Sequence, residues 1–359
     1  MGRLSPSARV VSDASELADL EPGWNALSGA AGSGPAGDFG WTRACVETFA
    51  DEGEPHVVVM GDPPRAIAPL VRSPSFHSRL VLAGVADLYE PTDFLYADQA
   101  ALDELAEALA ALGRPLFLGR IPSPSPSLHA LGRVFRSSGA VLSRGAGSCP
   151  YVELEEGSEP ESLLSKRRRS DMRRARRKAE ELGEVTTEAI SPKPDEVEPL
   201  LGRAFEVEAR GWKGRSGTAL AHDARRADFY RNYATAAAAN GSLRLLLMRI
   251  EEKEIAFQLG IDAGGSFWML KIGYDEEYGR ASPGQLLMLE SIRSAIERGL
   301  RGIEFLGSEA PWTQMWTKET RPCISAAVYP FRPRGASAAV SDAAWLGASA
   351  LRSRIRKSG

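Results

Sequence analysis

The sequence predicts an α/β (α+β) protein whose mixed, mostly antiparallel sheets are flanked by helices. Two observations predict this class, namely a β-β-α-β rhythm in the first half and a β-β-β-α-β order in the second half. A strongly basic segment between the two halves separates them into domains. At 359 residues the chain is long enough for two domains with their own cores. We expect one domain over residues 1–150, a second over residues 151–335 and a basic C-terminal tail over residues 336–359.

The first domain alternates between apolar periodic segments and turn-forming residues. We expect it to help form an acceptor site or to act as a scaffold, because Tyr89–Tyr96, its nearest counterpart to a phosphate loop, is acidic and lacks glycine. The predicted elements are helices over Ser15–Ala26, Trp41–Phe49 and Leu102–Leu112, and strands over His56–Gly61, Ala66–Val71 and Leu116–Ile121.

The segment Ser165–Lys178 (SKRRRSDMRRARRK) carries the densest positive charge in the chain. One interpretation is an electrostatic contact to phosphate groups, whether on RNA, coenzyme A or a nucleotide-linked acceptor. The other is a solvated helix whose charge is balanced by flanking glutamates. No aromatic residues interleave the run, although surfaces that stack nucleic-acid bases usually offer them.

The second half reads as a meander that leads into a helix. Leu243–Ile250, Ile255–Ile261 and Ser266–Gly273 are short apolar or alternating runs separated by tight-turn compositions. A helix then starts at Ser282-Pro283-Gly284 and ends at Gly299, and Arg301–Leu306 resumes as a strand. The three- and four-residue spacing of Leu286, Leu289, Ile292 and Ile296 predicts that one face of this helix is buried. In the Ala- and Ser-rich last part of the chain, we expect a short helix over Ala343–Ala350, followed by a frayed basic end.

The start of that helix is suited to an anion. Ser282 is expected to cap the first turn through its hydroxyl, and Pro283 suits the first helical position. Gly284 leaves no side chain between the backbone and an approaching ligand. First-turn N–H groups and the helix dipole together favour a phosphate. The alternative is that these residues only start a surface helix.

Composition excludes several classes of function. A net charge of −3 gives no general attraction to nucleic acid or a membrane. Cys45, Cys149 and Cys323 are too few and too scattered for a disulfide framework, and we expect buried reduced thiols. The four histidines have no metal-ligand spacing, so no metal is expected. Without an apolar run of membrane-spanning length or a leader-like start, a cytoplasmic protein is expected.

Three segments together resemble the GNAT superfamily of acyl-CoA-dependent N-acyltransferases, in particular its CelD/BioF-like branch. They are IAFQLGI, LKIGYDEEYGRASPGQLL and GSEAPWTQMW, with EARGWKGRSGTAL and DFY upstream. The resemblance covers the C-terminal half and implies tandem GNAT-like domains, the first one degenerate. It also implies that acetyl-CoA or a longer acyl-CoA is a co-substrate whose pyrophosphate rests at the helix start, in contact with Arg280, Ser282, Gly284 and Gln285.

For catalysis, the resemblance implies an oxyanion donor among the backbone N–H groups of Leu270–Gly273, with Ile272 beside the donor. It implies that a tyrosine protonates the leaving thiolate, Tyr278 as first choice and Tyr274 as second. Either tyrosine could instead pack on the sheet edge.

We expect Glu304 to be the general base, with Glu309 and Asp275 as runners-up, because acyl transfer requires the amine to lose a proton. Glu304 could instead face solvent on the other side of its sheet. Lys271 interrupts an aromatic strand and is expected to point toward the site. Some members of the branch have a lysine after an aromatic residue in the following loop, but here Thr313 follows Trp312.

The acceptor is expected to meet the segment Glu208–Leu220. Trp212 would supply an apolar wall, Lys213 would bind an anionic group and Glu208 would orient an amine, unless the loop only closes the core. Gln258 and Glu309 are assigned to the same acceptor site. Trp312 and Trp316, about one helical turn apart, are expected to pack.

Three functions remain open. The first is an N-acyltransferase acting on a primary amine of a small acceptor, such as an amino sugar or amino acid. The second is a Fem-like transferase that takes an amino acid from aminoacyl-tRNA, although the long helical hairpin usual in that group is absent. The third is a non-catalytic binding protein that retains the fold. A serine hydrolase is not supported, because no GxSxG motif occurs.

Overall fold

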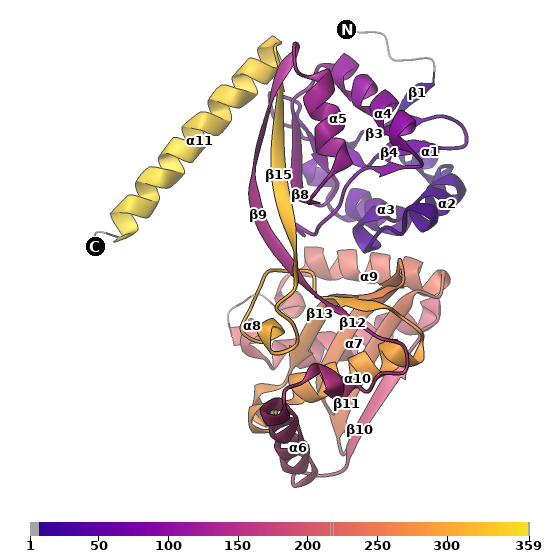
Figure 1. Cartoon of the computed structure of the whole chain (residues 1–359), viewed down its shortest axis with the longest axis vertical. Helices are drawn as coiled ribbons and strands as arrows, with labels where there is room; N and C mark the ends of the chain where they lie inside the picture. The colour runs from indigo at the N-terminus through magenta and orange to yellow at the C-terminus, as the bar shows by residue number, and fades with distance from the viewer. Residues whose placement is uncertain (1–6, 216, 218, 358–359) are drawn as a thin grey trace. The chain divides into compact units, whose positions relative to one another are not determined.

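A computed structural model describes residues 7–215, 217 and 219–357, without the side chains of 212, 213 and 347–357 (Figure 1). The chain divides into two compact units. Unit 1 contains the described residues of Met1–Ala31, Cys45–Gly147 and Pro322–Gly359, and unit 2 contains Gly32–Ala44 and Ser148–Arg321. Three elements belong to both units, namely α3 (Phe39–Thr48), β9 (Gly139–Glu153) and β15 (Thr320–Pro330).

Unit 1 is built on two groups of strands covered by helices. One sheet has the order β1-β3-β4-β7, and the other strands follow the order β15-β8-β6-β5-β2, with only β6 and β8 parallel among the described pairs. Its strands are β1 (Ala8–Val11), β2 (Glu54–Pro55), β3 (Val57–Met60), β4 (Ala66–Ala68), β5 (Leu70–Arg72), β6 (Leu80–Leu82), β7 (Leu95–Tyr96) and β8 (Leu116–Pro122). Its helices are α1 (Ala14–Ala18), α2 (Glu21–Ala31), α4 (Gln99–Leu112), α5 (Pro126–Val134) and α11 (Pro333–Lys357).

The helix expected over Ser15–Ala26 is divided into α1 and α2, and its apolar side chains Leu17, Leu20 and Trp24 are buried. The helix expected over Ala343–Ala350 is present but is much longer than expected, because it is part of α11, which begins at Pro333 and continues to Lys357. Its many alanines favour a long helix despite two internal glycines.

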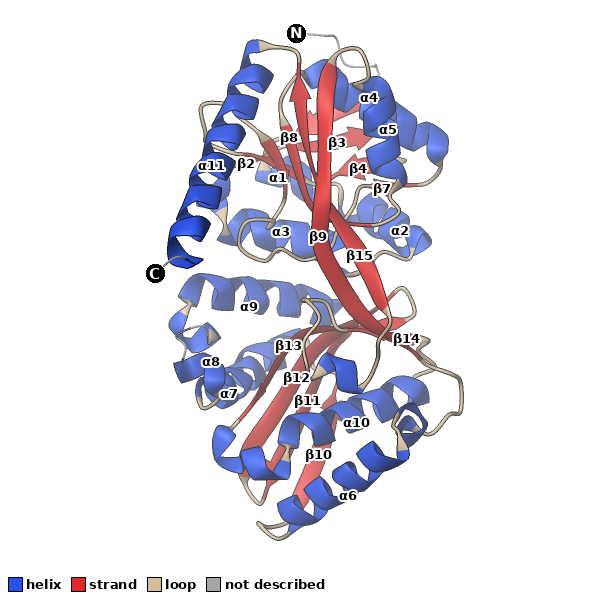
Figure 2. Ribbon diagram, turned by 60° about the vertical axis from the view of Figure 1, so that its left-hand side comes forward, coloured by secondary structure: helices blue, strands red, loops and turns tan. Residues whose placement is uncertain are grey.

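Unit 2 contains a six-strand layer in the order β10-β11-β12-β13-β14-β9. All of its neighbouring strands are antiparallel except β13 and β14. In Figure 2, α6 and α10 cover one face, and α7, α8 and α9 cover the other. Its strands are β10 (Val185–Ile190), β11 (Leu243–Ile250), β12 (Lys253–Ala263), β13 (Ser266–Tyr274) and β14 (Gly302–Glu304). Its helices are α6 (Lys166–Glu180), α7 (Val197–Ala209), α8 (Trp212–Arg215), α9 (Ala224–Ala239) and α10 (Pro283–Glu297).

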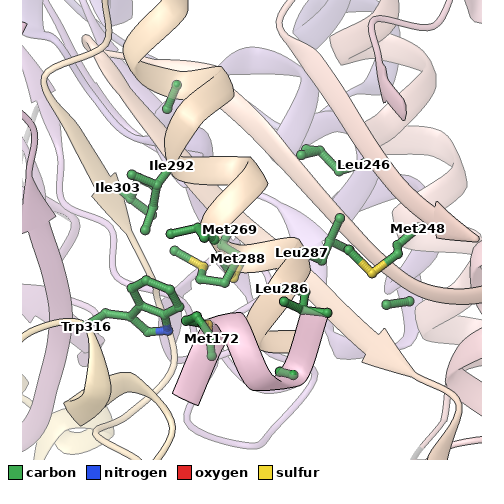
Figure 3. Close-up of a cluster of buried hydrophobic side chains, with 14 of the residues drawn as sticks. Met172, Leu246, Met248, Met269, Leu286, Leu287, Met288, Ile292, Ile303 and Trp316 are labelled. Atoms are coloured by element: carbon green, nitrogen blue, oxygen red, sulfur yellow. The ribbon is translucent and has the colours of Figure 1, made fainter. Parts of the chain in front are cut away.

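One hydrophobic core of unit 2 lies between its sheet and the pair α6 and α10 (Figure 3). Leu286, Leu289 and Ile292 of α10 are buried there, as their spacing predicted, and Met172 anchors the basic helix α6 to the same core. Burying such side chains stabilises the unit by about 1.5–3 kcal/mol each.

The predicted class is confirmed, with mixed, mostly antiparallel sheets flanked by helices in both units. The β-β-β-α-β order of the second half is also confirmed, and Gly299 follows α10 with a φ of 71°. The last strand is shorter than expected, because β14 covers only Gly302–Glu304. The three cysteines are buried thiols, as expected. Within the described part of the chain, no helix combines the length and apolar character that crossing a membrane requires.

Candidate functional site

The turn before α10 differs from the sequence prediction at one residue. A 3₁₀ helix, η6 (Glu276–Ala281), leads directly into Ser282, which has φ 52° and ψ 50°. The expected hydroxyl cap is wrong, since the Ser282 side chain makes no capping hydrogen bond. An N-cap side chain normally reaches the first-turn N–H groups from extended backbone, and Ser282 is left-handed because it must turn the chain between two adjoining helices. Its carbonyl accepts instead from the N–H groups of Gln285 (3.0 Å) and Leu286 (3.2 Å).

The start of α10 is open at Gly284. A Cβ added there would meet only the Cδ1 atom of Tyr274, at an ordinary contact distance of 3.4 Å. Arg280 is exposed in the preceding turn. The Oε1 atom of Gln285 accepts a hydrogen bond from Nε1 of Trp316 (3.1 Å), so its amide nitrogen is the end that can donate to a ligand. Backbone N–H groups, a helix dipole and a nearby guanidinium are a suitable combination for a phosphate.

Beside this helix start, the parallel strands β13 and β14 pair over only three positions. The last pair joins Trp268 to Glu304, after which β14 ends and β13 continues to Tyr274. β12 and β13 also shift register between Leu259 and Gly260, next to this point. The edge of β13 from Met269 to Tyr274 is therefore not covered by β14.

Glu304 lies where the two strands stop pairing. Its side chain is 5% exposed, and its Oε1 atom is 3.0 Å from Nε of Arg321. Its Oε2 atom is buried and has no hydrogen-bond partner among the described residues. Burial raises the pKa of Glu304 above its ordinary value, and the charge and hydrogen bond of Arg321 oppose that rise. Such a carboxyl group has one oxygen oriented by a cation and the other buried without a described hydrogen bond.

The side chain of Glu304 lies on the sheet face covered by α7, α8 and α9. Its neighbours in sequence, Ile303 and Phe305, belong to the core on the α10 face, and alternate strand residues point to opposite faces. Lys271 lies on the same face as Glu304, with its Nζ atom 4.8 Å from the centre of the Tyr230 ring in α9. The alternative that Glu304 faces bulk solvent is wrong, because its side chain is buried.

The two candidate tyrosines lie on the α10 side. Tyr274 and Tyr278 are both partly buried against the core of unit 2. Nζ of Lys253 lies 4.8 Å from the centre of the Tyr278 ring. Asp275, the runner-up base, is buried and already engaged, because it binds Arg210 (2.9 Å) and Lys253 (3.2 Å) and caps η6 through the Glu277 N–H (3.0 Å). Ile272 is half-buried on β13 and packs against the same core.

The residues assigned to the acceptor are not brought together. Glu208 is buried at the end of α7, where Oε2 accepts from the Leu220 N–H (2.8 Å) and so anchors the loop between them. Gln258 lies in the core under α10, bonded to Ser291 and near Met288. Glu309 accepts from the Ser148 hydroxyl (2.8 Å) in the loop after β14. The side chains of Trp212 and Lys213 lie outside the described residues.

Sequence reasoning missed Arg321 and Tyr151. Arg321 pairs with Glu304 and lies over the Tyr151 ring, 3.8 Å from its centre, and Tyr151 is the register partner of Glu304 on β9. No local motif links these positions, so only the strand order reveals them. Trp312 and Trp316 pack against the core, as predicted.

Residues 166–314 match a family model described as an acetyltransferase (GNAT) domain. A search of curated protein sequences finds no significant match. The finer assignment to the CelD/BioF-like branch remains a prediction.

Solved structures share the fold at low identity. The C-terminal domain of a putative lysylphosphatidylglycerol synthetase from Agrobacterium fabrum has a TM-score of 0.57 at 12% identity, over 92% of this chain and 97% of that one. FemX has a TM-score of 0.57 at 11% identity, over 86% of this chain and 96% of its own. A conserved protein of unknown function from Bacteroides thetaiotaomicron has a TM-score of 0.56 at 13% identity, over 89% of this chain and 99% of that one. At these identities the likeness concerns the fold, whereas the family match concerns the sequence of unit 2. Residues 166–314 are therefore similar in sequence to a GNAT-type acetyltransferase domain.

Proposed function

We propose that unit 2 transfers an acyl group from an acyl-CoA to a primary amine of a small acceptor, with Glu304 as the general base. The observation that carries this proposal is the Oε2 atom of Glu304, which is buried without a described partner at the point where β13 and β14 separate. A carboxyl group whose pKa is raised toward the working pH is better matched to accepting a proton from an amine than an ordinary surface carboxylate.

In this proposal the donor binds along the start of α10. The pyrophosphate would accept from the first-turn N–H groups at Gly284 and from Arg280 and the Gln285 amide. The pantetheine arm would then follow the uncovered edge of β13, and a backbone N–H between Leu270 and Gly273 would stabilise the oxyanion. The open space above Gly284 supports the first contact.

The reaction then requires two proton transfers. The amine nitrogen forms a bond to the thioester carbon, and Oε2 of Glu304 takes the proton that the nitrogen loses. The C–S bond breaks as the tetrahedral intermediate collapses, and the thiolate takes a proton from a tyrosine hydroxyl. Tyr278 and Tyr274 are the candidates for this acid. Tyr274 is the residue nearest to an added Cβ at Gly284, which supports including it.

The acceptor would approach from the face covered by α7, α8 and α9. Glu304 and Lys271 share this face, and the loop that Glu208 anchors borders the same side of β13, because a Cβ on Gly273 would lie 3.2 Å from Cα of Glu208. Lys271 would bind an anionic group of the acceptor. Glu208 would act by holding that loop in place.

Calorimetric binding of acetyl-CoA, followed by thiol release with a panel of amines, tests the proposal. We expect micromolar binding that is lost in Gly284→Glu, and amine-dependent thiol release that is lost in Glu304→Gln although this variant still binds acetyl-CoA. The absence of acyl-CoA binding to the native chain would reject the proposal.

A Fem-like transfer of an amino acid from aminoacyl-tRNA is the second candidate. The observation that favours it is α6, whose cations Arg167, Arg173, Arg177 and Lys178 are exposed on the surface of unit 2. Filter binding of charged tRNA distinguishes the two. Tight, salt-sensitive binding of the tRNA together with no binding of acetyl-CoA would replace the first proposal.

A further inference from the structure

A polar cavity of about 530 Å³ lies in unit 2 beside the loop that follows β14. Its volume is within the range of small-molecule sites. The side chains that matter for its chemistry are Arg168, Glu309, Gln314, Thr317, Lys318 and Thr320. We call it the Arg168 cavity. Among these residues, Glu309 was assigned to the acceptor above, and Arg168 belongs to the basic segment Ser165–Lys178.

The cavity carries two cations that no carboxylate of the described residues neutralises. The only described side-chain contact of Arg168 is from its Nη1 atom to the sulfur of Met315 (3.3 Å), and Lys318 is exposed. By contrast, Arg174 and Arg176 of the same helix pair with Asp171 (2.7 Å) and Glu180 (3.0 Å). Glu309 contributes the one lining carboxylate, so the lining has a net positive charge of one.

Neutral donors accompany the two cations. The Thr317 hydroxyl oxygen accepts from the Glu319 N–H (2.9 Å), so its hydrogen remains available to donate. Thr320 and the Gln314 amide also line the cavity. Several donors of different geometry around two cations suit a phosphate monoester better than a carboxylate. The phosphate monoester offers three acceptor oxygens and up to two negative charges, whereas a carboxylate offers two oxygens.

The strands place this cavity on the donor side of the sheet. Pro150 and Thr320 line the cavity. Along their strands, Pro150 directly precedes Tyr151 and Thr320 directly precedes Arg321, and the Arg321 side chain contacts both Tyr151 and Glu304. Alternation along a strand therefore assigns the cavity to the opposite face, which α6 and α10 cover. The short helix η7 (Thr313–Met315) joins the cavity to Trp316, which donates to Gln285 in the first turn of α10.

We propose that the Arg168 cavity binds a phosphate monoester. In the reaction proposed above, on which this inference rests, the group that carries one is the ribose 3′-phosphate of coenzyme A, separate from the pyrophosphate at α10. A free phosphorylated metabolite is the other source of the same chemistry. Arg168 supplies the main charge, and Lys318 adds a second cation.

Calorimetry of coenzyme A and dephospho-coenzyme A, which lacks only the 3′-phosphate, tests this inference on the full chain. We expect coenzyme A to bind about tenfold more tightly, the size of one charge-assisted contact. Arg168→Gln should remove this difference, and Lys318→Gln should reduce it. Arg174→Gln is the matched control, because it removes a charge from the same helix outside the cavity, and it should preserve the difference.

Broadening of the ³¹P signal of inorganic phosphate distinguishes the two sources. If both coenzymes bind alike but phosphate still binds in an Arg168-dependent manner, the cavity accepts a free phosphate monoester. If the affinities of coenzyme A and of inorganic phosphate are both unchanged in Arg168→Gln, the inference is overturned. Acetyl-CoA binding in the same preparation would still support the proposed function. Arg168-dependent phosphate binding without any acyl-CoA binding would support the cavity and reject the acyl-CoA reaction.

Discussion

Arg321 binds one carboxylate oxygen of Glu304, and the other oxygen has no described hydrogen-bond partner. Its Nε atom is 3.0 Å from Oε1, while the buried Oε2 has no partner among the described residues. The guanidinium also lies 3.8 Å from the centre of the Tyr151 ring, so stacking fixes its orientation. This arrangement holds a carboxyl group at the end of β14, at the position where its pairing with β13 stops.

Glu304→Gln should lower kcat by about 10²–10⁴-fold, because an amide cannot accept the proton of the attacking amine. The variant keeps the shape of the side chain and an oxygen for Arg321, so acetyl-CoA affinity and thermal stability should change little. Steady-state kinetics with calorimetry measure both. Glu309→Gln is the control, and a larger loss of kcat in that variant would transfer the role of base to Glu309.

Arg321→Gln should move the rising limb of the pH–rate profile to higher pH. Glu304 is active as a base when ionised, so the rate falls as pH decreases through its pKa. Burial raises that pKa and Arg321 opposes the rise, so removal of the guanidinium leaves the pKa higher still. The pH dependence of kcat/KM measures the shift, and an unchanged limb would show that another group titrates.

Gly284→Glu should weaken acetyl-CoA binding by on the order of 100-fold or more, because a carboxylate would stand where the pyrophosphate is expected. The added Cβ has space, and Glu is favourable in a first helical turn, so stability should be preserved or slightly increased. Gly202→Glu in α7, where an added Cβ meets nothing within 4 Å, is the matched control and should bind normally. Calorimetry and thermal denaturation test both variants.

Ser282→Gly should stabilise the chain by about 1 kcal/mol, because glycine adopts the left-handed backbone without a steric cost. Ser282→Ala should lower the free energy of unfolding by far less than the ~1 kcal/mol typical of losing a capping serine, because the Ser282 hydroxyl makes no capping hydrogen bond. Chemical denaturation compares the two. A full capping loss in Ser282→Ala would contradict the observed backbone.

Ile292→Ala should lower the free energy of unfolding by about 2–5 kcal/mol, because this side chain is fully buried under α10 and its removal leaves a cavity. Ile296→Ala, one turn later and only partly buried, should cost less. The midpoint of denaturant unfolding measures the difference. Equal effects would mean that the face of α10 toward the core is placed differently.

The sequence by itself determined the features that depend on neighbouring residues. The meander follows from apolar runs and tight turns, the end of α10 at Gly299 follows from the freedom of glycine, and the helix start at Pro283 follows from the preference of proline for that position. The buried face of α10 follows from three- and four-residue spacing. The choice of Glu304 as the base rests on its place in the strand expected beside the one that leads into α10, and it stays a prediction.

Only the tertiary structure decided the rest, because it depends on contacts between distant segments. The pairing of Glu304 with Arg321 requires β14 and β15 to be folded, and the engagement of Asp275 by Arg210 and Lys253 is equally non-local. The left-handed Ser282 results from the adjoining η6, which overrides the local preference of serine for capping. The Arg168 cavity joins α6 to the loop after β14, so no window of sequence could contain it.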